Sequence, residues 1–136
     1  MNKQAIKKVL ITGANGFIGG TLMRYYQNQG QDVIGVDLVG NGADILEGDI
    51  SQPHTISHLL NECDVIVHTA ALVSNAMQDS DMWRVNVLAT RNLITAAKEH
   101  KVRRFVQISS VVAYGNSAEG ELDENQPVHA LSLIHI

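Results

Sequence analysis

The residues with the clearest chemical potential form a glycine turn at residues 12–19, Thr-Gly-Ala-Asn-Gly-Phe-Ile-Gly. The turn follows a short apolar segment and opens a helix-like stretch, which is the context that a phosphate-binding turn requires. Gly13 permits the tight turn, Gly16 has no Cβ to block a pyrophosphate, and Gly19 allows close packing of helix on strand. The free N–H groups at the start of the helix and the helix dipole would then favour binding of an anion. The alternative interpretation is a glycine turn that only connects a strand to a helix. The residues predicted to contact a dinucleotide here are Gly13, Asn15, Gly16, Phe17, Ile18 and Gly19.

A carboxylate follows at the spacing expected for recognition of a ribose. Asp37 ends the next apolar segment, about 20 residues beyond the turn, where it could accept hydrogen bonds from an adenosine ribose. Asp37 would also repel a 2′-phosphate, and residues 38–41 contain no Arg or Lys to neutralise one. Taken alone, Asp37 could be a solvated acid at a strand end. Together with the glycine turn it predicts a dinucleotide site that prefers NAD to NADP.

These residues need a scaffold in which strand ends meet, and the chain has the pattern for one. Short apolar segments alternate with stretches of helical period, and continuous apolar strands are usually buried on both faces. Such alternation produces parallel strands with right-handed crossovers. We therefore expect an α/β fold, a Rossmann-type doubly wound parallel sheet of about five strands in the order 3-2-1-4-5. The predicted strands are residues 8–12, 32–38, 43–47, 64–69 and 104–109, and the predicted helices are residues 16–29, 53–60 and 80–100.

The helical stretches also predict which side chains face the core. We expect Ser51 or Gln52 near the N-cap of the second helix, with Pro53 in its first turn. From about residue 116 the composition turns polar and predicts a loop. The predicted core positions are Ile18, Leu22, Tyr25 and Tyr26 in the first helix, and Met82, Val85, Ala89, Leu93 and Ala96 in the long one.

The composition of the 136 residues is that of one globular domain, with 45% hydrophobic and 18% charged residues. A formal net charge of −4 gives no general reason to bind nucleic acid or an anionic membrane. No apolar run approaches the roughly 20 residues that span a bilayer. The single cysteine, Cys63, excludes an internal disulfide framework and fits a reducing compartment, so a cytoplasmic location is expected. His54 and His58 lack an apparent third ligand, so no metal site is predicted.

Four further motifs follow the glycine turn in order along the chain. They are Gly48-Asp49-Ile50, His68-Thr69-Ala70-Ala71, Asn86 within Val85-Asn86-Val87, and Ser109-Ser110-Val111-Val112-Ala113-Tyr114-Gly115. Together with the turn they resemble the N-terminal part of an extended short-chain dehydrogenase/reductase, the NAD-dependent epimerase/dehydratase family. The resemblance covers residues 8 to about 115.

The resemblance implies a set of cofactor contacts and one catalytic residue. The acid of the second motif meets the adenine, and the third motif lies along the cofactor. Ser110 matches the serine that hydrogen-bonds the reacting oxygen, whereas Tyr114 belongs to a turn and is not the catalytic tyrosine. The implied contacts beyond the turn are Asp37, Leu38, Asp49, Ile50, His68, Thr69, Ala70, Ala71, Asn86 and Ser109.

The family's Tyr-x-x-x-Lys pair is absent from this chain. No Tyr follows Tyr114 and no Lys follows Lys101. The position of the family's tyrosine falls at residues 131–136, Leu-Ser-Leu-Ile-His-Ile, a hexapeptide that a common transposon-based sequencing adaptor encodes in frame. We therefore expect an NAD(P)-binding Rossmann domain at 1–130, incomplete at its C-terminus, and a non-native adaptor-derived tail at 131–136. A genuine sixth strand is the alternative for this tail.

The resemblance thus predicts the cofactor-binding part of an NAD-dependent epimerase, dehydratase or dehydrogenase. Its substrate would be a small molecule, namely a nucleotide sugar, a sterol or another alcohol or carbonyl compound, and the reaction would proceed by hydride transfer. This fragment itself is expected to be inactive, and the full-length protein is expected to form a homodimer. A non-catalytic NAD(P)-binding regulatory or assembly module is the alternative, because such relatives keep the glycine turn and lose the Tyr or Lys.

Overall fold

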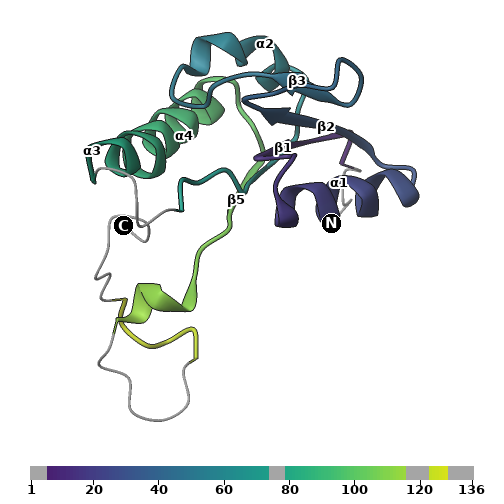
Figure 1. The fold of residues 1–136 in the computed structure, drawn as a ribbon. Helices are drawn as coiled ribbons and strands as arrows, with labels where there is room; N and C mark the ends of the chain where they lie inside the picture. The colour runs from purple at the N-terminus through teal and green to yellow at the C-terminus, as the bar shows by residue number, and fades with distance from the viewer. Residues whose placement is uncertain (1–5, 74–78, 116–122, 129–136) are drawn as a thin grey trace.

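A computed structural model describes residues 6–73, 79–115 and 123–128 of the chain (Figure 1). Five strands form one all-parallel sheet in the order β3-β2-β1-β4-β5. The predicted fold class and strand order are therefore confirmed. The predicted tail at 131–136 lies outside the described residues. The strands are β1 (Lys8–Thr12), β2 (Asp32–Asp37), β3 (Ile45–Glu47), β4 (Val65–His68) and β5 (Arg104–Gln107).

Helices cover both faces of this sheet. In Figure 1, α1 lies on one face, and α2 and α4 lie on the other. None of the helices in the described part of the chain combines the length and apolar character needed to cross a bilayer. The helices are α1 (Phe17–Asn28), α2 (Ser57–Leu60), α3 (Asp79–Met82) and α4 (Thr90–Glu99), with 3₁₀ turns at Pro53–Thr55 and Val111–Tyr114 and a π-helical segment at Trp83–Ala89.

The central strands divide their side chains between two core layers. Leu10 of β1 and Ile66 of β4 pack with Leu93 of α4 in one layer. Ile11 packs with Met23 of α1 in the other layer. Because successive side chains of a strand point to opposite faces, a continuous apolar segment is needed to fill both layers. The prediction of buried strands is thus correct for β1 and β4.

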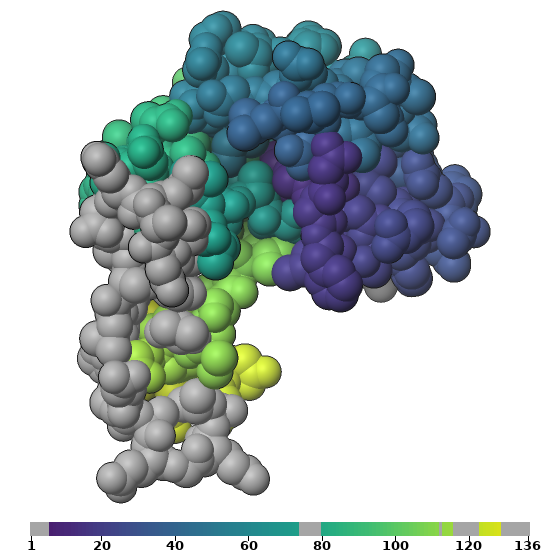
Figure 2. Space-filling view, viewed as in Figure 1, coloured from purple at the N-terminus to yellow at the C-terminus, as the bar shows by residue number. Residues whose placement is uncertain are grey.

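The same prediction is wrong for β5. Phe105 packs against the α2 and α4 layer, but Val106 on the opposite face is 36% exposed. The physical reason is that β5 forms the edge of the sheet, whereas α1 packs against β1 and β2. After β5 the chain leaves the sheet, and Figure 2 shows the light-green residues beyond it projecting from the main body.

The predicted core face of the first helix is also partly wrong. Ile18 and Tyr25 are exposed, whereas Gly19 and Met23 are the buried residues of α1. Gly19 lies directly against the backbone of Gly13 in the turn, and Met23 packs against Gly35 of β2, so the helix approaches the sheet closely along these two residues. This close approach moves the buried stripe by one residue relative to the predicted one.

The long helix predicted at 80–100 is not a continuous α-helix. It consists of α3, the π-helical segment Trp83–Ala89 and α4. The wider π-helical turns change the phase of the helix, so Ala97 is buried and Ala96 only partly so. The helix predicted at 53–60 is likewise divided at Ile56, which joins the 3₁₀ turn to α2.

Candidate cofactor site

The glycine turn joins β1 to α1 at the carboxyl end of the sheet. Gly13 has a φ angle of +69°, a left-handed conformation that glycine adopts without strain. A Cβ on Gly13 would also lie 2.8 Å from the backbone of Ala70. A Cβ on Gly19 would lie 2.1 Å from the carbonyl oxygen of Gly13, a distance that no side chain tolerates. The turn therefore has the tight shape and close helix packing that the sequence predicted.

The start of α1 is open to an acceptor from outside the helix. Gly16 is the N-cap and has an extended backbone, with no side chain to cap the first turn. A Cβ at this position would meet only the carbonyl oxygen of Gly13 within 4 Å. The first N–H groups of α1, which have no partner within the helix, can therefore bind an anion.

A cavity of about 850 Å³ lies beside this turn, where the carboxyl ends of β1, β2, β3 and β4 meet. Most of the predicted cofactor contacts form its wall, whereas His68, Asn86, Ser109 and Ser110 do not line it. The predicted residues that line it are Gly13, Asn15, Gly16, Phe17, Ile18, Gly19, Asp37, Leu38, Asp49, Ile50, Thr69, Ala70 and Ala71; the further lining residues are Val36, Gly48, Leu72, Asp81, Arg84 and Val85.

Asp37 ends β2 and is held by hydrogen bonds from two backbone amides. The N–H of Asn15 donates to Oδ2 over 2.9 Å, and the N–H of Leu38 donates to Oδ1 over 2.8 Å. A carboxylate offers about four acceptor sites, so two remain for hydroxyl groups of a ligand. Asp37 thus lies in the cavity wall with its orientation set and with acceptor capacity left.

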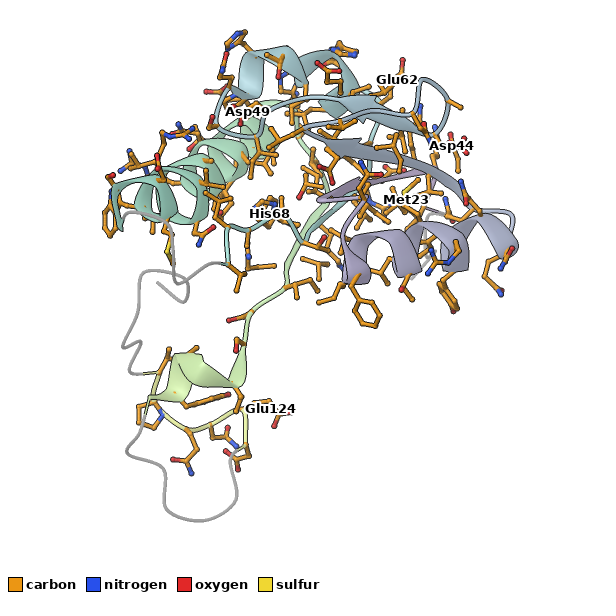
Figure 3. The ribbon with its side chains drawn as sticks, viewed as in Figure 1. Met23, Asp44, Asp49, Glu62, His68 and Glu124 are labelled. Atoms are coloured by element: carbon orange, nitrogen blue, oxygen red, sulfur yellow. The ribbon has the colours of Figure 1, made fainter. Side chains whose placement is uncertain are left out.

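Asp49 follows β3 and provides a second carboxylate in the cavity wall. Its Oδ1 accepts a hydrogen bond from the N–H of Ser51 over 2.8 Å. Burial opposes ionisation of Asp49, but hydrogen bonds from Ser51 and Gln52 and the charge of Arg84 outweigh burial and lower the pKa of this carboxyl. Asp49 is therefore ionised at neutral pH and able to accept a hydrogen bond from an amino group. Figure 3 places it on the side of the molecule where α4 lies.

Three cavity residues from the long helical region escaped the sequence prediction. Asp81, Arg84 and Val85 line the cavity, and a guanidinium N–H of Arg84 donates to Ser51 Oγ over 3.1 Å. Their i, i+3, i+4 spacing places them on one helical face, which is the signal that could have found them. The sequence pattern assigned Val85 to the core instead.

The side chain of His68 points into the core rather than the cavity. It is 0% exposed, and its Nδ1 and Nε2 lie 2.6 Å from Thr12 Oγ1 and 2.9 Å from Thr90 Oγ1. Burial lowers the pKa of His68 to about 4, so the imidazole is neutral at neutral pH. Figure 3 shows this residue in the interior. The geometry therefore gives the His68 side chain a structural role, joining β1 and β4 to α4, and the contact of this residue with the cofactor stays a prediction.

Asn86 acts on the cavity through the backbone that follows β4. Its Nδ2 donates to the carbonyl oxygen of Leu72 over 2.9 Å, and its Oδ1 accepts from the N–H of Leu72 over 2.8 Å. The segment 69–72 contributes to the cavity wall, so this pair of bonds holds one wall in place. The structure thus shows an indirect role for Asn86, and its contact with the cofactor stays a prediction.

Ser109 and Ser110 follow β5 on the segment that leaves the sheet. Both are exposed, and neither lines the cavity. A substrate bound by Ser110 would therefore lie outside this cavity, and the catalytic role of Ser110 stays a prediction.

A parallel sheet in the order 3-2-1-4-5, with a glycine turn and strand-end carboxylates around a cavity at its carboxyl edge, defines a Rossmann-type protein. The chain belongs to the NAD dependent epimerase/dehydratase family, whose model matches residues 9–133. The family resemblance predicted from the motifs is thus confirmed.

Individual relatives within this family differ in what they act on. The dTDP-glucose 4,6-dehydratase of Streptomyces antibioticus is 31% identical, with 88% of this chain and 42% of the relative covered. Sterol demethylase protein B of Methylococcus capsulatus is 33% identical, with 88% of this chain and 39% of the relative covered. The UDP-glucose-4-epimerase of Stenotrophomonas maltophila, solved with NAD and formylated UDP-arabinopyranose, has a TM-score of 0.83, 25% identity and coverage of 94% of this chain and 44% of that one. The chain thus spans less than half the length of each of these three proteins.

Proposed function

We propose that this chain binds NAD in the cavity beside the glycine turn, as the cofactor-binding part of an epimerase, dehydratase or dehydrogenase. The observation that carries this proposal is the position of Asp37 and Asp49 at neighbouring strand ends in the wall of one cavity, together with the open start of α1. Family membership supports it, and so does the NAD bound in the structure of the Stenotrophomonas epimerase.

The residues present fit such a cofactor. The volume of about 850 Å³ lies within the range of roughly 300–1,000 Å³ that is usual for small-molecule sites. The first N–H groups of α1 would hold the pyrophosphate, Asp37 the ribose hydroxyls, and Asp49 the amino group of the adenine. A Cβ at Gly13 would lie 2.8 Å from the backbone of Ala70, so glycine allows the turn and the segment after β4 to lie side by side in the cavity wall. When bound, NAD supplies the acceptor for a hydride, and its reduced form supplies the donor.

NAD is proposed as the preferred cofactor over NADP. The Asp37 carboxylate would repel a 2′-phosphate, and residues 38–41 carry no cation to offset that repulsion. Both arguments rest on charge, so the preference should weaken at high ionic strength.

The proposed substrate is a nucleotide sugar, with a sterol or another alcohol or carbonyl compound as the second choice. Relatives named as a dTDP-glucose 4,6-dehydratase and a UDP-glucose-4-epimerase support the first class, and the sterol demethylase protein supports the second. We also propose that the full-length protein is a cytoplasmic homodimer.

We further propose that these 136 residues bind the cofactor without turnover, because they contain no Tyr-x-x-x-Lys pair. A phenol with a pKa near 10 needs a neighbouring cation to act as a base at neutral pH. The same observation favours a second candidate function, a non-catalytic NAD(P)-binding module. The genomic sequence beyond Ala130 discriminates the two, since a Tyr-x-x-x-Lys pair there indicates an enzyme and its absence a binding module.

The direct test is a fluorescence titration of the chain with NADH and NADPH. We expect saturable binding of NADH that is tighter than binding of NADPH, and weaker NADH binding in the variant Asp37→Ala. Asp32→Ala is the matched control, because Asp32 lies at the opposite end of the same strand and does not line the cavity. A folded chain that binds neither nucleotide would contradict the proposal.

A further inference from the structure

Asn15 connects the glycine turn to the loop that follows β2. Its side-chain Nδ2 donates a hydrogen bond to the carbonyl oxygen of Val39 over 2.6 Å. Its backbone N–H donates to Oδ2 of Asp37 over 2.9 Å. One residue of the turn therefore holds both the carboxylate that ends β2 and the backbone two residues beyond it.

The loop after β2 has polar anchors at both of its ends. At the far end, Oδ1 of Asn41 accepts hydrogen bonds from the N–H groups of Ala43 and Ile45. At the near end, Leu38 and Val39 are 64% and 68% exposed, so burial of their side chains contributes little to holding them. The near end thus depends on the hydrogen bonds that Asn15 and Asp37 make.

The orientation of the Asp37 carboxylate follows from these contacts. The N–H of Asn15, in the glycine turn, donates to one oxygen, and the N–H of Leu38, at the start of the loop, donates to the other. The carboxylate therefore has a defined position in the cavity wall. Its negative charge then lies where a ribose hydroxyl can donate to it and where a 2′-phosphate would be repelled.

We propose that Asn15 is a positioning residue that determines the choice between NAD and NADP, an inference that rests on the proposed function. The side chain of Asn15 holds the carbonyl of Val39, and through this loop it keeps the Asp37 carboxylate directed at the ribose. The backbone N–H of residue 15, which every variant keeps, continues to donate to Asp37. Loss of the Asn15 side chain frees the near end of the loop. The Asp37 carboxylate then moves away from the ribose, which weakens its hydrogen bonds to NAD and also relieves its repulsion of NADP.

Three variants test this inference by fluorescence titration with NADH and NADPH. In Asn15→Ala we expect roughly three- to tenfold weaker NADH binding, the effect of one lost hydrogen bond. NADPH binding should become tighter, because the Asp37 carboxylate repels the 2′-phosphate less. In Asn15→Asp the carboxylate cannot donate to Val39 and adds a negative charge, so both nucleotides bind more weakly. Asn28→Ala, an exposed position at the end of α1, is the matched control and should leave both affinities unchanged.

Hydrogen exchange without any nucleotide provides an independent readout. The backbone amides of Asn15 and Leu38 should exchange faster in Asn15→Ala than in the wild type or in Asn28→Ala. Because Asn15 is exposed, its variants should keep the circular dichroism spectrum of the wild type. Unchanged exchange together with an unchanged ratio of NADH to NADPH affinity would overturn the role of Asn15 and leave the proposed function standing. A wild-type chain that binds neither nucleotide would instead overturn the proposed function and, with it, this inference.

Discussion

Acidification should destabilise this protein through the buried imidazole of His68. The imidazole is completely buried and has two threonine hydroxyls as hydrogen-bond partners. Hydroxyls can satisfy either ring nitrogen, but they do not neutralise a positive charge. Protonation of the folded protein therefore requires burial of an uncompensated charge, which is why burial lowers the pKa of His68 from 6.5 to about 4.

The sign and size of the effect follow from this difference in pKa. The unfolded chain binds the proton more readily, so the stabilisation by neutral His68 is complete above pH 6.5 and is lost as the pH falls toward 4. A shift from 6.5 to about 4 corresponds to about 3 kcal/mol in total. At pH 5 the free energy of unfolding should already be lower by about 2 kcal/mol than at pH 7.5.

Urea unfolding at several pH values between 7.5 and 5 measures this loss. The variant His68→Gln should be less stable at pH 7.5 but should show a much smaller dependence on pH over this range. The exposed residue His54 provides the control, and His54→Gln should keep the pH dependence of the wild type. Asp49 and Glu62, whose pKa values lie below their ordinary values of 3.8 and 4.5, stay ionised in this window. If the wild type and His68→Gln lose the same free energy between pH 7.5 and 5, the reasoning about the buried imidazole is refuted.

Three further predictions concern Gly19, Asn86 and the thiol of Cys63. Gly19→Ala should abolish NADH binding and lower the free energy of unfolding by roughly 1–3 kcal/mol, because its Cβ would lie 2.1 Å from a carbonyl oxygen of the turn; thermal melting and titration measure the two effects. Asn86→Ala should cost about 1–3 kcal/mol in urea unfolding, since it leaves the N–H and C=O of Leu72 without their partner. Cys63 should react slowly with a thiol reagent at pH 8 in the folded chain, because burial, and then the charge of Asp64, raise the pKa of its thiol to about 11.

Each of these predictions has a result that would contradict it. A Gly19→Ala variant with the melting temperature of the wild type would mean that α1 can move away from the turn. An Asn86→Ala variant as stable as a variant of the exposed residue Asn92 would mean that water replaces its side chain. A Cys63 thiol that reacts as fast in the native chain as in urea would mean that the native state opens readily at this position.

The sequence alone was sufficient for the sheet and for the glycine turn. Apolar segments that alternate with helical stretches leave few other arrangements than a parallel sheet with crossovers. The turn was predictable because its requirements are local: a positive φ at Gly13 and a missing Cβ at Gly19 can be inferred from residue type and spacing. Asp37 was found in a similar way, from its place at the end of a predicted strand, whereas Asp49 was found through the resemblance of its motif to the family.

The tertiary structure decided which way the remaining side chains around the glycine turn and the strand ends point. His68 and Thr69 are neighbours in one motif, yet the first is buried in the core and the second lines the cavity, because the two side chains leave the chain in opposite directions. Asn86 of the π-helical segment pairs with the backbone of Leu72, 14 residues away, across a separation in sequence that no local pattern encodes.

Sequence patterns therefore determined the fold, the turn and the two strand-end carboxylates of this protein, because backbone conformation and burial are encoded by neighbouring residues. Only the tertiary structure decided which groups support those carboxylates. The hydrogen bonds of Asn15 with Asp37 and Val39 join the turn before α1 to the end of β2 and to the loop after it. They form only once α1 has packed on the sheet. The backbone N–H groups of Gly13 and Ala14 also donate to the carbonyl oxygen of Val36, so the folded chain alone brings the turn beside the end of β2.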